Sequence, residues 1–374
     1  MKFPKYKELI ITNNHTRKMS SGDSSVESSV LFSGVPDTSY NSSPYLPEPF
    51  LSENQSRYVM FPIQHPDIFE MYKQATSSFW VCDELTFAQD MIDLEKKMTA
   101  SEKQFIFQIL AFFSSSDGVV IENLQQRFTQ EIKIPEALAF YAFQSAIEAV
   151  HSEAYSLMID TYCKGDDTMK HRLFNAVTTF PAIAEKNAWA IKWVNDHTAT
   201  FAKRVFAFAI VEGLFFSASF CALFWVRSRG LLPGLSFANQ LIARDEGLHT
   251  AFACLIYSKL KNRLSVSEAH AMMTEAVDIE RRFITESIPC SMIGMNADLM
   301  TQYIKYIADR LLTQLSYDKI YNTQNPFSFV EQATIPAKQN FFEGRSSEYS
   351  LACVNVNGKQ AIPDMLSLNM DDDF

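Results

Sequence analysis

The chain has 374 residues, 47% of them hydrophobic, and a formal net charge of −10. This is enough for one large or two ordinary domains with a sizeable core, and the acidic balance disfavours a nucleic-acid-binding surface, which needs a basic patch. Six scattered cysteines with no CxxC pair indicate free thiols in a reducing compartment, and the N-terminus lacks the apolar core of a secretory signal, so we expect a cytoplasmic protein.

Composition predicts three parts of the chain. Residues 1–55 are rich in Ser, Asn and Pro, which predicts a disordered extension because such a segment buries little apolar surface. From about residue 57 the chain is dense in apolar residues with a helical period. We therefore expect a helical domain over 56–340 and a flexible C-terminal tail over 341–374.

The periodic segments predict an all-α bundle. Pro135 suits a first helical turn, Gly230 with Pro233 marks a break between helices, and no stretch alternates convincingly as a strand. Long helices are expected at 101–130, 135–163, 200–228 and 235–262, and shorter ones near 168–179, 182–197, 266–286 and 297–315.

The segment 205–225 is long and apolar enough to span a membrane, with Glu212 as its one charge. The alternative is the central helix of a large soluble bundle, which is apolar all round. We favour the bundle because no second comparable span is evident and the flanking segments have ordinary soluble composition. Glu212 then needs a partner inside the protein.

The stretch EAVHSEAY places Glu148, His151 and Tyr155 on one face of an apolar helix. A second Glu-x-x-His pair, Glu246 and His249, occurs in ARDEGLH. A buried carboxylate without a partner costs several kcal/mol or more. Each pair therefore indicates either a metal site or a buried ion pair.

Two further acids of buried type lie on the remaining long helices, and together the four helices offer the donor set of a ferritin-like di-iron carboxylate bundle. Four carboxylates and two neutral imidazoles carry a charge of −4, which two divalent cations would balance. Oxygen and imidazole donors suit iron or manganese, and the absence of thiolates disfavours structural zinc. The candidate ligands are Asp117, Glu148, His151, Glu212, Glu246 and His249.

Tyr155 has two interpretations that periodicity leaves open. It is either a core tyrosine or a phenol close enough to the metals to be oxidised. Phe216 and Phe220 share the face of Glu212, and Ile242 lies four residues before Glu246. These three residues would wall the site with apolar surface, or they are simply core.

Long stretches from 57 to about 350, among them LAFFSSSDGVV, IPEALAFYAFQSAIEAVHSEAYSLMIDTY and NPFSFVEQATIPAKQNFFEGRSSEYS, resemble the small, radical-generating subunit of class I ribonucleotide reductase, of the eukaryotic and large-DNA-virus type. The resemblance implies that the six candidate ligands hold two iron ions, with manganese possible, and that the metals react with dioxygen. It gives Tyr155 the position of a stable tyrosyl radical and Phe216, Phe220 and Ile242 the pocket that protects it.

The resemblance also implies a radical-transfer route to a large subunit. Trp80 matches the tryptophan of that route, and Asp245 matches the aspartate that links it to His151. Tyr349, in SSEYS, matches a tyrosine that relays the radical between subunits.

The chain ends in LSLNMDDDF, and an acidic stretch is usually just solvated. In the family that it resembles, an acidic C-terminal peptide docks on the large subunit. Leu368, Met370 and Phe374 would then be apolar anchors, with the aspartates supplying steering.

The function implied is the small subunit of a ribonucleoside-diphosphate reductase, acting as a homodimer or as a heterodimer with a paralogue. The chain has no phosphate-cradling Gly-rich loop, consistent with nucleotide binding on the large subunit. One alternative is another di-iron oxidase, desaturase or hydroxylase, which would need neither Tyr155 nor the tail. A second is an iron-storage or non-catalytic paralogue, which lost ligands would mark, and none is missing. The resemblance is loose just after Trp80, absent in the N-terminal extension and weak in the tail beyond Tyr349.

Overall fold

The computed structural model describes residues 46–51, 57–287 and 295–330. The chain divides into two units, Met1–Pro44 and Tyr45–Phe374, and every described residue belongs to the second. The domain boundaries expected at 55/56 and 340/341 fall among residues outside these ranges and stay predictions.

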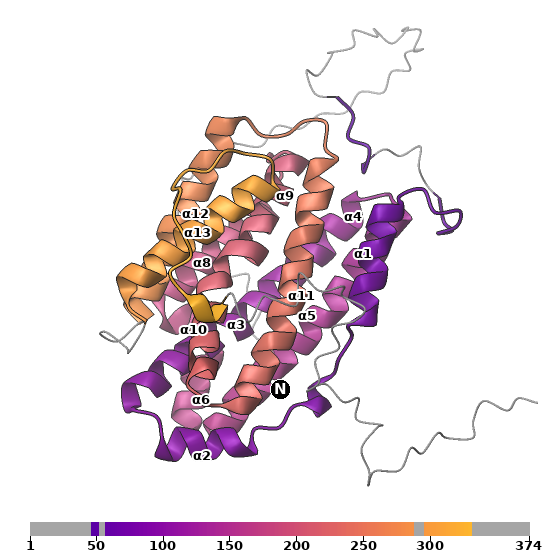
Figure 1. The fold of residues 1–374 in the computed structure, drawn as a ribbon. Helices are drawn as coiled ribbons and strands as arrows, with labels where there is room; N and C mark the ends of the chain where they lie inside the picture. The colour runs from indigo at the N-terminus through magenta and orange to yellow at the C-terminus, as the bar shows by residue number, and fades with distance from the viewer. Residues whose placement is uncertain (1–45, 52–56, 288–294, 331–374) are drawn as a thin grey trace, which may run out of the picture. The chain divides into compact units, whose positions relative to one another are not determined.

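The centre of the described unit is built from long helices. They are α3 (Ala100–Asn123), α5 (Pro135–Tyr162), α9 (Phe201–Ile210), α10 (Ser217–Ser228) and α11 (Pro233–Ser258). Helix α3 packs against α5, and α11 packs against α9 and α10. Figure 1 shows α5 and α11 running beside each other through the bundle. The four long helices expected from the periodicity are therefore present.

One of these predicted helices differs in detail. The segment expected as one helix at 200–228 contains a π-helical turn, η5 (Val211–Phe215), between α9 and α10. A second π turn, η4 (Leu124–Phe128), follows α3 and leads into the short α4 (Thr129–Glu131). π turns are rare in proteins, but those that occur are often found at functional sites. The turn η5 contains the candidate ligand Glu212.

The remaining helices surround this centre, and the described residues form no β-strand. Helices α12 and α13 pack on each other, and α12 also packs on α8. The periodicity did not predict α1 and α2, and the helix expected near 168–179 is divided into α6 and α7. Their bounds are α1 Pro66–Ser77, 3₁₀ turn η3 Cys82–Glu84, α2 Ala88–Lys96, α6 Asp167–Phe174, α7 Ala176–Thr179, α8 Pro181–Asn195, α12 Val266–Ser287 and α13 Ala297–Gln314.

The start of α11 is fixed by a buried acid on α2. Leu232 has a positive φ of 48° just before Pro233, so the chain turns sharply into the helix. The Asp90 carboxylate accepts hydrogen bonds from the backbone N–H groups of Gly234 (2.8 Å) and Leu235 (2.7 Å) and from the Tyr162 hydroxyl (2.6 Å). It thereby satisfies N–H groups that the first turn of a helix leaves free.

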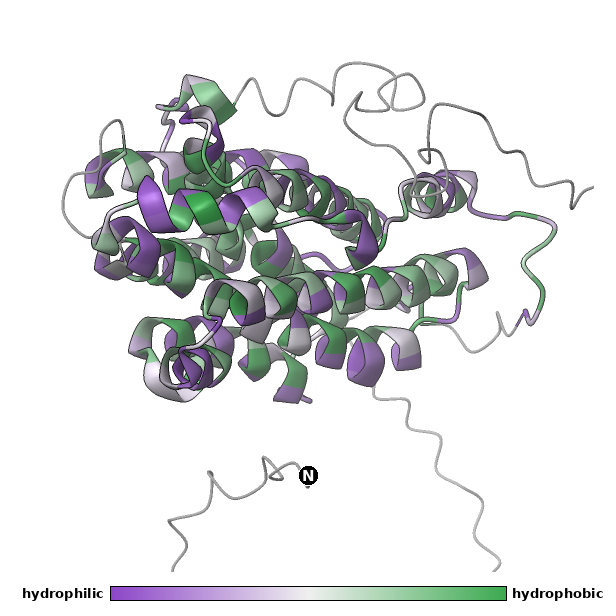
Figure 2. Cartoon of the chain, turned by 90° about the horizontal axis from the view of Figure 1, so that it is seen from below, coloured by the Kyte–Doolittle hydropathy of each residue, from purple (hydrophilic) through white to green (hydrophobic). Residues whose placement is uncertain are grey.

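Among the described residues, two helical segments are long and apolar enough to cross a membrane, Ala100–Glu131 and Phe201–Ser228. The expectation that 205–225 has no comparable second span is therefore wrong. Of the most apolar window in each segment, 56% and 89% respectively is buried inside the protein, so both are core helices of the bundle. Figure 2 shows that helices of the bundle carry both hydrophobic and hydrophilic residues, as expected for helices with one face in a core.

Candidate metal centre

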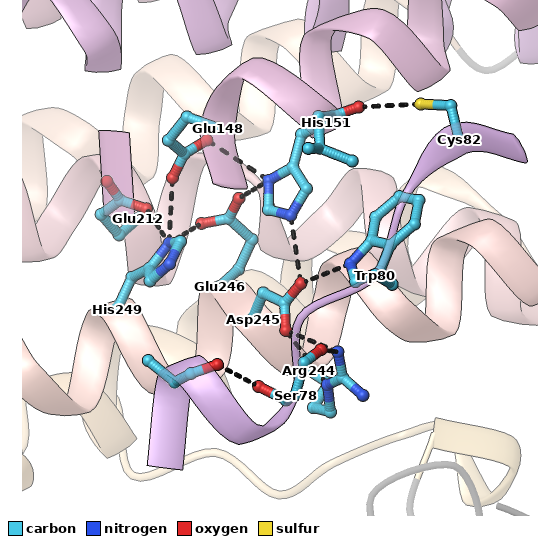
Figure 3. A network of polar contacts seen from close by, with 12 residues as sticks. Ser78, Trp80, Cys82, Glu148, His151, Glu212, Arg244, Asp245, Glu246 and His249 are labelled. Carbon is cyan, nitrogen blue, oxygen red and sulfur yellow. Dashed lines mark hydrogen bonds and ion pairs between the residues drawn. The ribbon is translucent and has the colours of Figure 1, made fainter. Parts of the chain in front are cut away.

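Three helical segments bring four buried donor residues together, and we name them the metal cluster. They are Glu148 on α5, Glu212 on η5, and Glu246 and His249 on α11, and one ligand atom from each lies within 4.8 Å of all the others. His249 Nδ1 lies 2.9 Å from Glu148 Oε1, 3.4 Å from Glu246 Oε2 and 3.7 Å from Glu212 Oε2. Figure 3 shows the three carboxylates converging on this imidazole.

His151 contacts two of these three carboxylates, Glu148 and Glu246. Its Nδ1 atom lies 3.2 Å from Glu246 Oε1 and 3.3 Å from Glu148 Oε2. Glu148 and Glu246 therefore each turn one oxygen toward His151 and the other toward His249 (Figure 3). Carboxylates placed in this way between two imidazoles can serve two neighbouring cations.

Asp117 adds a carboxylate from α3. It is buried, and its Oδ2 atom has no hydrogen-bond partner among the residues that the structure describes. Burial, followed by the charge of Glu148, raises the pKa of Asp117 well above its ordinary value. The charges of both histidines also act on it, so it shares the electrostatic environment of the metal cluster.

The donor set fits a pair of divalent cations. Glu212 accepts a hydrogen bond from Gln144 Nε2 at 3.1 Å. Within the described part of the chain, its Oε2 atom, like Asp117 Oδ2, has no hydrogen-bond partner. Burial and the neighbouring Glu246 raise the pKa of Glu212 well above its ordinary value. Buried carboxylate oxygens without partners are costly, and metal coordination would supply what they lack.

Local sequence explains how the donors meet. Each Glu-x-x-His pair lies on one helical face, because residues three apart are neighbours there. Gly213 allows η5 to approach α11 closely, since a Cβ atom at this position would lie 2.8 Å from Thr250 Cγ2. Gly213 follows Glu212 and Thr250 follows His249, so this close contact brings the two donors together.

Tyr155 is buried one helical turn beyond His151, and none of the described residues forms a hydrogen bond with its hydroxyl. Burial raises the pKa of Tyr155 well above its ordinary value, and the charges of Asp117, Glu246 and Glu148 raise it further. The phenol therefore stays protonated, in a dry environment close to the metal-cluster acids.

A group of phenylalanines lies against Tyr155. Phe113 stacks on the tyrosine ring, with centroids 4.6 Å apart and an interplanar angle of 9°. The ring centroids of Phe220 and Phe216 lie 5.0 Å and 5.8 Å from that of Phe113. Phe113 therefore links these two predicted pocket residues to Tyr155. Ile242 is buried on α11. Sequence reasoning missed Phe113, although it lies four residues before Asp117 and shares its face.

A chain of polar contacts connects His151 to the segment that follows α1. His151 Nε2 lies 3.3 Å from Asp245 Oδ2, and the same oxygen accepts a 2.8 Å hydrogen bond from Trp80 Nε1. Arg244 donates to Asp245 Oδ1 (2.9 and 3.0 Å) and to the Ser78 carbonyl (2.7 Å). Figure 3 shows this connection. No sequence pattern pointed to Arg244, because its carbonyl partner lies in a distant segment.

The expected relay residue Tyr349 and the expected anchors Leu368, Met370 and Phe374 lie outside the described residues. Of the cysteines, Cys82, Cys163, Cys221 and Cys254 are buried free thiols.

Comparisons of the sequence with known proteins all point to one family. The model of the family "Ribonucleotide reductase, small chain" matches residues 57–326. The chain is 50% identical over 329 residues to the ribonucleoside-diphosphate reductase small subunit of Dictyostelium discoideum, covering 87% of this chain and 97% of the relative. It is 49% identical over 334 residues to the corresponding protein of Nicotiana tabacum, covering 88% of this chain and 100% of the relative.

Solved structures agree in fold. The Rnr4 ribonucleotide reductase homodimer of Saccharomyces cerevisiae matches with a TM-score of 0.69 and 33% identity, covering 78% of this chain and 93% of that one. The ribonucleotide reductase R2 subunit of Clostridium botulinum matches with a TM-score of 0.68 at 21% identity, covering 72% and 89%; this second likeness shows the fold alone. The ferritin-like helical fold is thus confirmed, and the chain belongs to the ribonucleotide reductase small-chain family.

Proposed function

We propose that this chain is the radical-generating small subunit of a ribonucleoside-diphosphate reductase and that it holds two divalent metal ions. One observation carries the proposal: Glu148 and Glu246 each face both imidazoles within one buried cluster. The proposed ligands are Asp117, Glu148, His151, Glu212, Glu246 and His249. Iron is the metal we favour, and manganese suits the same donors.

When bound, these ions would supply, together with dioxygen, the one-electron oxidation of Tyr155. The chain provides the environment for the product of that step. The phenol would give its electron to the metals and dioxygen and its proton to a neighbouring carboxylate such as Asp117, and its ring lies against Phe113, with Phe216 and Phe220 behind it. This aromatic wall excludes water and other reductants from the ring. Ile242 is the fourth proposed pocket residue.

We further propose that the oxidising equivalent leaves through His151, Asp245 and Trp80. The hydrogen bonds that join these groups support this route, and Arg244 holds the Asp245 carboxylate in place from its other oxygen. Tyr349 would carry the radical onward to a cysteine of the large subunit. There, ribonucleoside diphosphates would be reduced to deoxyribonucleoside diphosphates.

The proposed partner is the large subunit, docked through Leu368, Met370 and Phe374. The structure of the yeast relative is a homodimer, and this supports a homodimer here. The alternative is a heterodimer with a paralogue. We also propose a cytoplasmic location and no nucleic-acid partner.

The deciding experiment is a metal titration of the full chain followed by electron paramagnetic resonance of the oxygen-exposed protein. We expect two metal ions per chain and a tyrosyl signal. Binding of fewer than two ions would contradict the di-metal centre, and two ions without a tyrosyl signal would contradict the radical.

A further inference from the structure

A buried ion pair lies outside the proposed metal centre and radical route. Lys186 on α8 and Glu280 on α12 have no exposed side-chain surface, and Lys186 Nζ lies 2.6 Å from Glu280 Oε2. Burial lowers the pKa of Lys186 to about 8 and raises the pKa of Glu280 to about 7. A buried pair is costly to form and often adds no stability over apolar residues, so stability alone does not account for it.

The lysine is directed at the end of the η5 turn. Its Nζ atom donates a 2.7 Å hydrogen bond to the backbone carbonyl of Phe215, the last residue of η5. The rings of Phe112 and Phe283 lie 3.4 Å and 3.9 Å from the same atom, measured to their centroids. These contacts leave the ammonium group little freedom to move.

The glutamate lies near α10, the helix that follows η5. Glu280 lies on α12, which packs against both η5 and α10, and the nearby backbone N–H group of Ala218 acts to lower the pKa of Glu280. The pair therefore approaches the junction of η5 and α10 through both of its members. Across the turn, Gly213 packs against Thr250 of α11, so η5 is held from two sides.

Glu212 lies three residues before Phe215 on this turn. A π turn inserts an extra residue into a helix and so changes the direction of the side chains around it. We propose that Lys186 is a positioning residue that, through its bond to the Phe215 carbonyl, fixes η5 so that Glu212 reaches the metal cluster. This inference rests on the proposed metal centre, and Glu280 serves to keep the lysine in place.

The test uses the full chain, stripped of metal and titrated with cobalt(II), whose absorption spectrum reports coordination. Lys186→Met with Glu280→Met replaces the pair by apolar residues of similar length and removes the donor to Phe215. We expect this double variant to fold with unchanged helix content. Its cobalt(II) affinity should fall about tenfold or more, as is typical when a partner that orients a ligand is lost. Its cobalt spectrum should change, and the amides of residues 211–217 should exchange hydrogen faster.

A second variant separates the carbonyl contact from the ion pair. Glu280→Gln keeps an acceptor for Lys186, and the lysine, charged or neutral, still donates to Phe215. We expect wild-type cobalt(II) affinity and exchange at 211–217. A tenfold or greater loss of affinity in Glu280→Gln would overturn the inference, because this variant keeps the bond from Lys186 to the Phe215 carbonyl, and its measurement does not depend on the double variant folding.

The matched control is the exposed pair Arg282 and Glu185, which joins the same two helices. Arg282→Gln with Glu185→Gln should leave cobalt(II) binding unchanged. Wild-type affinity and spectrum in the Lys186→Met, Glu280→Met chain would overturn the inference while leaving the metal centre intact. Failure of the wild-type chain to bind two cobalt(II) ions would instead overturn the metal centre and the inference with it.

Discussion

Tyr155 and Tyr162 lie two turns apart on α5, and both are buried, but their hydroxyls meet different surroundings. Tyr162 donates a 2.6 Å hydrogen bond to Asp90, whereas the hydroxyl of Tyr155 has no hydrogen-bond partner in residues 46–51, 57–287 and 295–330. A buried hydroxyl without a partner adds cost and no stability. That contrast is what we expect when one tyrosine has a structural role and the other a chemical one.

Replacing Tyr155 by phenylalanine should abolish the tyrosyl signal and nucleotide reduction while changing the free energy of unfolding by less than about 1 kcal/mol. The ring and its stacking on Phe113 remain, and metal loading should stay normal. Paramagnetic resonance and thermal unfolding are the measurements. Tyr162→Phe is the control, and it should lower stability while keeping the radical signal. A wild-type signal in Tyr155→Phe would require the radical to be assigned to another residue.

For single residues, the sequence predicts which side chains share one face of a helix. It does not predict which side chains of other helices contact them. The spacing of Glu148 and His151 is enough to place both on one face. The stacking of Phe113 on Tyr155 requires α3 to lie against α5, and the anchoring of Arg244 requires the Ser78 carbonyl. No local pattern encodes these contacts between distant segments.

Among the elements, η5 combines an irregular backbone with a close approach to α11. Periodicity could not reveal it, because 200–228 is apolar on all sides and one extra residue leaves no visible break in such a pattern. Helices α1 and α2 were missed for another reason: with 12 and 9 residues they are short, so their apolar period repeats over only about two or three turns.

Gly213→Ala should weaken metal binding, because the new methyl group would lie 2.8 Å from Thr250 Cγ2 and push η5 away from α11. Metal titration by calorimetry is the measurement. Gly247→Ala provides the control, since it lies beside Glu246 on α11 and, beyond its own helical turn, no described residue has an atom within 4 Å of the added methyl group. It should raise stability by up to about 1 kcal/mol through helix propensity alone. Equal metal affinity in both variants would contradict the role given to this contact.

Asp90→Ala should destabilise the fold by about 2–4 kcal/mol, because buried N–H groups at the start of α11 and the Tyr162 hydroxyl would lose their acceptor. Denaturant unfolding measures the effect. Glu95→Ala, at an exposed position on the same helix, should change stability by less than about 0.5 kcal/mol. A similar small change for Asp90→Ala would show that water replaces the carboxylate.

For the whole molecule, the helical unit and the C-terminal segment should have separable roles. Removing the residues after Asn340 should leave stability, metal binding and the Tyr155 radical intact, because that segment shows no strong helical stripe that would pack into the bundle. Turnover with the large subunit should be lost. An activity assay beside a binding assay on the same protein measures both effects.

Two smaller changes divide the roles within that segment. Tyr349→Phe should bind the large subunit normally and fail in turnover, while deletion of LSLNMDDDF should weaken binding. Normal turnover by Tyr349→Phe would break the proposed radical route, and unchanged binding after the deletion would break the docking assignment.

The proposed donors come from α3, α5, η5 and α11, in that order along the chain. While the protein is being synthesised, the site therefore stays incomplete until His249 has left the ribosome and α11 has packed. A nascent chain that ends earlier has single carboxylates and at most one Glu-x-x-His pair, which are weak ligands by themselves. In the proposed arrangement metal would therefore be taken up only after α11 has emerged and packed, and the interval between that packing and loading is a stage at which supply of metal would limit the amount of active protein.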